Sequence, residues 1–163
     1  MSTDTTVTPV SDLNMFTRLG LWVATGFIFT PSDMVAIERK GVPGSAVKNL
    51  AEKLSLTTVR FAQIIGAPKA TLERKAANGG LITGSSAHAA LGTAKLINTV
   101  QAMLDDSTHP DAKKTDAAKW LGQWIEQPQP ALGGQKPADL MDTPTGMAMV
   151  SRVLGALASG AYL

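Results

Sequence analysis

Residues 58–75 read TVRFAQIIGAPKATLERK, and this stretch decides the fold. Ala62 is a small residue where a second helix can cross closely, and Gly66 follows where a sharp turn needs a positive φ. Leu72 then supplies an apolar anchor on the second helix, with Phe61, Ile65 and Ala67 completing the buried side. This spacing predicts a helix-turn-helix, whose second helix lies in the major groove of DNA.

The outward residues of the second helix are the candidate DNA contacts. Arg74 has the side chain that can grip a guanine edge with two hydrogen bonds. The cations of Arg60, Lys69 and Lys75 are expected on phosphates. The predicted DNA-binding residues are Arg60, Lys69, Thr71, Arg74 and Lys75.

The charge of the chain is uneven and favours DNA binding. From Glu38 to Lys75 there are eight Lys/Arg and three Glu, a net charge of +5, whereas the whole chain carries only +2. A basic segment of this kind suits an anionic partner, with nucleic acid as the first choice. The same small-residue and glycine spacing also occurs in helical cores that bind no DNA. Glu73 would weaken DNA binding unless it accepts a hydrogen bond from a cytosine amine.

The rest of the chain also reads as helical, because apolar residues recur with a period of 3.6 and rarely with a period of two. The fold class is therefore all-α. Polar, turn-rich residues 105–111 (DDSTHPD) mark the best internal boundary. Three parts result: a variable N-terminal segment 1–30, a helix-turn-helix part 31–106 and a small helical part 111–163. The expected helices cover about 32–40, 45–55, 57–66, 68–78, 86–104, 112–126 and 143–159, and an ordered loop covers 127–137.

The C-terminal end is unusually poor in charge. Residues 143–163 contain one charged side chain, Arg152. Met147, Val150, Leu154 and Leu157 form one apolar stripe with apolar flanks, which predicts a helix buried on most sides. The apolar sides of this helix could be buried against Trp120 and Trp124 of the same chain, or against a partner protein. The free carboxylate that follows Tyr162 and Leu163 is available to a basic pocket in such a partner.

Residues 124–150, WIEQPQPALGGQKPADLMDTPTGMAMV, carry a family resemblance. Together with residues 160–162 they resemble the toxin-binding domain of Xre/MbcA/ParS antitoxins, and residues 42–104 are similar to the Xre-type helix-turn-helix half of the same proteins. The matching positions are Trp124, Pro128, Leu132, Gly133, Gly134, Pro137, Leu140, Thr143, Gly146, Val150, Leu154 and Gly160.

The resemblance implies a type II antitoxin paired with a RES-domain toxin, which degrades NAD. It implies that the C-terminal domain covers the active-site cleft of the toxin, while the N-terminal domain forms a homodimer and represses its own operon at a palindromic operator. The alternatives are a stand-alone ParS-like transcription regulator without a dedicated toxin, and a structural adaptor. The toxin-binding residues implied are Trp124, Leu132, Gly133, Gly134, Pro137, Leu140, Thr143, Arg152, Tyr162 and Leu163.

Other chemistry finds little support in the sequence. The chain has no cysteine, and its two histidines, His88 and His109, lack a zinc-binding pattern. None of its glycine-rich stretches fits a phosphate-binding motif, and no serine is flanked like a nucleophile elbow. We expect no enzyme activity, no cofactor and no metal. The longest apolar run, 19–29, is shorter than the ~20 residues of a membrane-spanning helix. We expect a cytoplasmic protein.

Overall fold

The computed structural model describes residues 31–161 and has the predicted helix-turn-helix. Its first helix is α4 (Thr58–Ile65) and its second is α5 (Lys69–Asn78). The hydroxyl oxygen of Thr57 caps α4 by accepting a hydrogen bond from the Arg60 backbone N–H at 3.1 Å. Gly66 ends α4 with φ of 70°, so the turn uses a conformation that other residues rarely adopt. Ala62 and Leu72 are buried at the crossing, as the spacing predicted.

Within the described residues, two more helices precede the helix-turn-helix. They are α2 (Pro31–Lys40) and α3 (Gly44–Lys53). The start of α3 packs directly on α5, because a Cβ added at Gly44 would lie 2.5 Å from the Ala76 backbone nitrogen. All four helices follow the expected order, and their ends differ from the expected ones by one or two residues.

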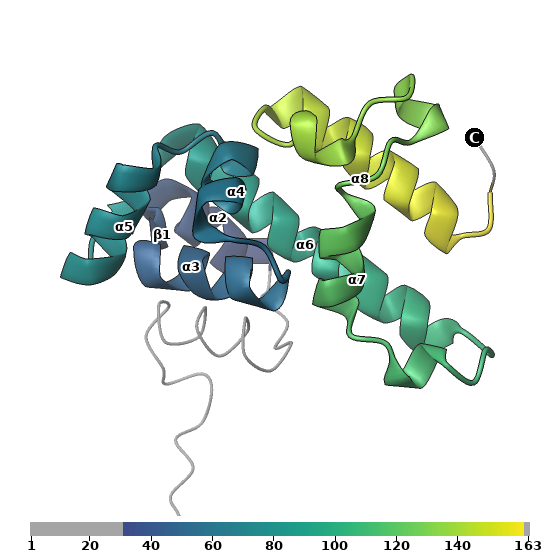
Figure 1. The fold of residues 1–163 in the computed structure, drawn as a ribbon. Coiled ribbons are helices and arrows are strands. Elements are labelled where there is room, and N and C mark those ends of the chain that lie inside the picture. The colour runs from purple at the N-terminus through teal and green to yellow at the C-terminus, as the bar shows by residue number, and fades with distance from the viewer. Residues whose placement is uncertain (1–30, 162–163) are drawn as a thin grey trace, which may run out of the picture.

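A small antiparallel sheet was not predicted. Its strands are β1 (Val42–Pro43) and β2 (Leu81–Ile82), with Val42 opposite Ile82. Each strand has two residues, too few to show an alternating pattern in the sequence. The pair fastens the start of α3 to the chain that leaves α5 (Figure 1).

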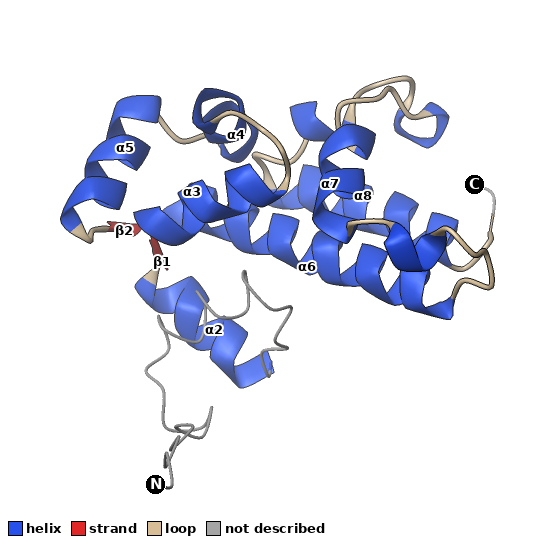
Figure 2. Cartoon of the chain, turned by 60° about the horizontal axis from the view of Figure 1, so that its bottom comes forward, coloured by secondary structure: helices blue, strands red, loops and turns tan. Residues whose placement is uncertain are grey.

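The long helix α6 (Gly84–Asp106) joins the two parts of the molecule. It packs against α2 and α4 of the N-terminal part, and against α7 (Ala117–Trp124) and α8 (Pro144–Ala158) of the C-terminal part. Figure 2 shows it running through the middle of the molecule. Its buried side is built mainly of small and aliphatic residues, including Ala87, Leu91, Ala94, Val100 and Leu104.

Between α6 and α8 the structure is more broken than the sequence suggested. The helix expected over 112–126 is split into the 3-10 turn η2 (Ala112–Lys114) and α7, because Asp116 caps a new helix by accepting a hydrogen bond from the Lys119 N–H. The connecting segment, residues 125–142, contains the short turns η3 (Pro130–Leu132) and η4 (Pro137–Asp139). The expected loop is thus ordered by local turns.

Helix α8 begins and ends as predicted. The hydroxyl oxygen of Thr143 accepts a hydrogen bond from the Gly146 N–H at 3.0 Å, and Gly160 follows with φ of 73°. Its inner side is buried through Met147, Val150 and Leu154 against α6 and η3. The chain itself does not bury the helix on most sides, since Leu157 is 45% exposed, so covering by a partner protein stays a prediction for this residue. Leu157 is exposed because α6 covers one side of α8 only.

Candidate functional site

The outer side of α5 presents the predicted DNA contacts to solvent. Lys69, Ala70, Glu73 and Arg74 are exposed, and Thr71 and Lys75 are half-buried. The ammonium of Lys69 lies 3.9 Å from the carboxylate of Glu73, one helical turn away. Two exposed cations therefore remain on this side with a single carboxylate, which suits an approach to phosphates.

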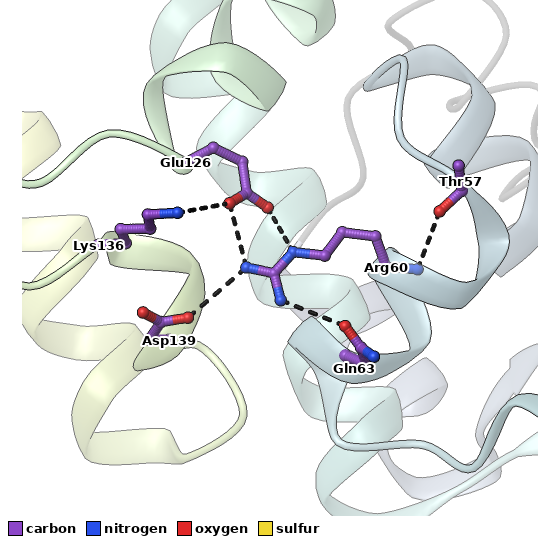
Figure 3. A network of polar contacts seen from close by, with 6 residues as sticks. All are labelled: Thr57, Arg60, Gln63, Glu126, Lys136 and Asp139. Atoms are coloured by element: carbon purple, nitrogen blue, oxygen red, sulfur yellow. Dashed lines mark hydrogen bonds and ion pairs between the residues drawn. The ribbon is translucent and has the colours of Figure 1, made fainter.

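Arg60 of α4 has a different environment. Its Nε donates a hydrogen bond to Glu126 Oε1 at 2.6 Å, and its Nη2 donates one to Glu126 Oε2 at 3.1 Å. The same Nη2 lies 3.5 Å from Asp139 Oδ1, and Nη1 donates to Gln63 Oε1 at 3.4 Å. Lys136 Nζ lies 3.7 Å from Glu126 Oε2 on the other side (Figure 3). We call these four charged residues, Arg60, Glu126, Lys136 and Asp139, the Arg60 cluster.

The Arg60 cluster changes the acidity of its members. The hydrogen bonds from Arg60, aided by the charges of Arg60 and Lys136, hold the pKa of Glu126 below its usual value, although partial burial opposes this. The same hydrogen bond raises the pKa of Arg60. Both groups are therefore charged across the physiological pH range.

Acidification should weaken this cluster. A carboxyl group with a lowered pKa in the folded state stabilises the protein above its pKa in the unfolded chain, about 4.3 for glutamate. That contribution is lost as the pH falls through the lower pKa of folded Glu126. Lowering the pH from neutral into this acidic range should lower the Tm of the wild type. We expect the same change of pH to lower the Tm of Glu126→Gln by less. Equal pH profiles in thermal melts would contradict this.

An apolar stripe lies on the outer side of α8. Met149 is 41% exposed, Leu157 is 45% exposed, and half-buried Val153 lies between them at four-residue spacing. Arg152, the charged residue of this helix, is exposed beside Met149. Large apolar side chains in such an arrangement are typical of a surface that contacts another protein.

Comparisons with known proteins match both parts of the chain. Residues 33–84 match the antitoxin Xre-like helix-turn-helix domain, and residues 110–160 match the antitoxin Xre/MbcA/ParS C-terminal toxin-binding domain. The chain is also 36% identical over 133 residues to the Prs ADP-ribosylating antitoxin of Sphingobium sp. (strain YBL2), and the alignment covers 82% of each protein. The chain belongs to the Xre/MbcA/ParS antitoxin family. The resemblance found in the sequence is thereby confirmed.

The structure divides the implied toxin-binding residues of this antitoxin into two groups. Trp124, Leu132 and Pro137 are buried, and Trp124 stacks on Trp120 with ring centroids 6.1 Å apart. These three side chains lie in the interior and are not exposed to a partner in the free chain. Leu140 is half-buried, and the exposed residues are Gly133, Gly134, Thr143 and Arg152. Tyr162 and Leu163 lie outside the described residues, as does the N-terminal segment 1–30.

Sequence reasoning missed two features of the antitoxin. The partners of Arg60 could not be found, because Glu126 stands 66 residues away and no local pattern joins them. The exposed stripe on α8 was hidden in a helix that is apolar on most sides. Its signal was present, since Met149, Val153 and Leu157 repeat every four residues on a side distinct from Met147, Val150 and Leu154.

Residues 31–161 offer little to a metal ion or a small molecule. This part of the chain has no group of three or more His, Asp or Glu side chains placed to hold a metal ion. A hollow of about 220 Å³ between α6 and α8, lined by residues including His88, Lys95 and Ser151, is smaller than the ~300–1,000 Å³ usual for small-molecule pockets. Among these residues, no helix is both long and apolar enough to cross a membrane.

Proposed function

We propose that this antitoxin binds and neutralises a RES-domain toxin that consumes NAD, and that it represses its own operon as a DNA-binding homodimer. The observation that carries the proposal is the combination of two unlike surfaces in one chain. The helix-turn-helix exposes Lys69 and Arg74, whereas α8 exposes the stripe Met149, Val153 and Leu157. A cationic helix suits DNA, and an apolar helix side suits the cleft of a protein.

The chemistry proposed for the toxin rests on the family resemblance, and the name of a relative lends it support. The name of the Sphingobium relative joins the words antitoxin and ADP-ribosylating. We assign the corresponding NAD chemistry to the toxin partner, because blocking a cleft by occupancy needs no catalytic group in the antitoxin. Hydrolysis of NAD and transfer of its ADP-ribose both release nicotinamide, so nicotinamide release reports either reaction.

The first experiment is a pull-down from the native host with a tag at the N-terminus, followed by intact-mass identification of the partners. We expect a RES-domain protein in stoichiometric amount. Once separated from the antitoxin, it should release nicotinamide from NAD, and this release should stop when the antitoxin is added back. A sample that contains this chain alone, still dimeric and bound to DNA, would instead support the stand-alone regulator.

The DNA-binding role predicts a specific loss. Arg74→Ala and Lys69→Ala should each weaken binding to the operator of the antitoxin's own operon by about 1–3 kcal/mol, because each removes a contact to a base edge or a phosphate. Fluorescence anisotropy at matched salt measures this, with Lys113→Ala as the control, since Lys113 is exposed in the C-terminal part. If all three variants bind like the wild type, α5 is not the DNA-reading helix.

A further inference from the structure

Arg60 stands on the first helix of the helix-turn-helix, yet its guanidinium extends to the C-terminal part of the chain (Figure 3). Its two hydrogen bonds to Glu126 form a fork that matches both carboxylate oxygens. Its third contact, to Asp139, reaches the other end of the same loop. One side chain of α4 thus ties together residues at either end of the stretch 126–139.

Close packing supports the tie at the same boundary. A Cβ added at Gly66, the turn between α4 and α5, would lie 3.4 Å from the Cβ of Asp142. A Cβ added at Gly122, just before the connecting segment, would lie 2.0 Å from the Leu54 carbonyl oxygen. The end of the connecting segment therefore lies against the turn of the helix-turn-helix, and the helix before the segment packs closely on the end of α3.

The connecting segment holds itself together mostly through its own backbone. The Ala138 N–H donates to the Ile125 carbonyl at 2.9 Å, and the Gln129 N–H donates to the Gln135 carbonyl at 3.0 Å. These hydrogen bonds fix the shape of the loop, but they do not fix its position on α4. The side chain of Arg60 provides that second kind of constraint.

The charge of the cluster argues against phosphate binding by Arg60. Two cations, Arg60 and Lys136, face two carboxylates, Glu126 and Asp139, so the group is neutral as a whole. A phosphate that approached Arg60 would meet these carboxylates and would have to displace hydrogen bonds already formed. Such a neutral, partly buried group offers little attraction to DNA.

We propose that Arg60 is a positioning residue for the connecting segment, and that it holds this segment ready for toxin binding instead of contacting DNA. The toxin-binding half of this inference rests on the proposed function, while the other half concerns DNA and the segment alone. A loop already held in its bound position loses less conformational entropy when a partner binds. Arginine is required because lysine cannot form the two-pronged contact.

The test compares three variants of the full-length protein. Arg60→Gln removes the guanidinium that donates two hydrogen bonds to Glu126, and Glu126→Gln removes the carboxylate that accepts them. Arg74→Gln removes a cation from the outer side of α5. Amide hydrogen exchange over residues 126–142 reports the position of the segment. Operator affinity and its salt dependence report DNA contacts. The dissociation rate of the co-purified RES-domain protein reports toxin binding.

We expect two rates to rise about tenfold in both Arg60→Gln and Glu126→Gln. These are the rate of amide exchange in the connecting segment and the rate of toxin dissociation. The double variant should be about as impaired as Arg60→Gln alone, because that change already removes the Arg60–Glu126 contact as well as the contact to Asp139. Operator affinity and salt slope should stay at the wild-type values. Arg74→Gln should show the opposite pattern, with weaker DNA binding and an unchanged segment.

A control separates positioning from simple loss of stability. Thr57→Ala removes the cap of the same helix without touching the side chain of Arg60, so it should lower the Tm but leave toxin dissociation unchanged. Arg60→Lys keeps the charge but cannot form the two-pronged contact, so the toxin should still dissociate from it faster than from the wild type.

Several outcomes would overturn the inference. If Arg60→Gln weakens operator binding as Arg74→Gln does, Arg60 contacts DNA. If exchange in the segment rises but the toxin dissociates at the wild-type rate, Arg60 does not position the toxin surface. If the wild type captures no toxin at all, the proposed function fails, and exchange and operator binding still decide whether Arg60 belongs to the segment or to DNA.

Discussion

Gly122→Ala is expected to lower the free energy of unfolding by about 3 kcal/mol, at the upper end of ordinary overpacking effects. The added methyl group would lie 2.0 Å from the carbonyl oxygen of Leu54, at the end of α3. A backbone oxygen cannot move aside as a flexible side chain can, so α7 and α3 must separate. The loss should appear as a Tm lower by about 10 °C in circular dichroism melts.

Gly155→Ala is the matched control for this prediction. Gly155 also lies within a helix, α8, but a Cβ added there meets no atom within 4 Å. The intrinsic gain in helix propensity, up to about 1 kcal/mol, is the same in both variants. Gly155→Ala should therefore stabilise the protein slightly. Similar melting temperatures for the two variants would mean that α7 and α3 do not approach each other this closely.

The second large effect is expected on the outer side of α8. Replacing both Met149 and Leu157 with Glu should weaken toxin binding by about 100-fold, because two apolar anchors become charges that must be buried at the interface. Both side chains are more than one third exposed in the free protein, so the fold should tolerate the change. Growth protection measures the loss of neutralisation, and so does nicotinamide release if the partner is the proposed RES-domain toxin.

Ser151→Glu is the control for the α8 variant. Ser151 is exposed on the same helix, but it lines the hollow toward α6 and lies away from the stripe. This variant should neutralise the toxin, and operator binding should be unchanged in both. Full protection by the double variant would show that the toxin uses another surface of the antitoxin.

The predictions from sequence succeeded where short-range chemistry determines the structure. Thr57, Gly66 and Leu72 define the helix-turn-helix because a cap, a positive φ and an anchor each act within a few residues. Thr143 and Gly160 delimit α8 for the same reason. The fold class and the family could therefore be read from the chain.

The predictions were weaker where distant residues determine the structure. Arg60 was assigned to phosphates because its charge was visible in the sequence, whereas Glu126 and Asp139 became its neighbours only through folding. The sequence left open whether the same chain or a partner covers Leu157, because it does not show how much of α8 is covered by α6. The two strands were missed because pairs of residues carry no period.

The position of α6 limits how such an antitoxin can be assembled from parts. Helices of the helix-turn-helix part and of the C-terminal part bury their apolar sides on this one helix. A C-terminal part fused to the helix-turn-helix of another protein would lose the helix on which α7 and α8 pack, unless most of α6 were included in the fusion. Substitutions on the surfaces of α5 and α8 should therefore change the partners that a relative recognises more readily than recombination of N-terminal and C-terminal parts from different relatives.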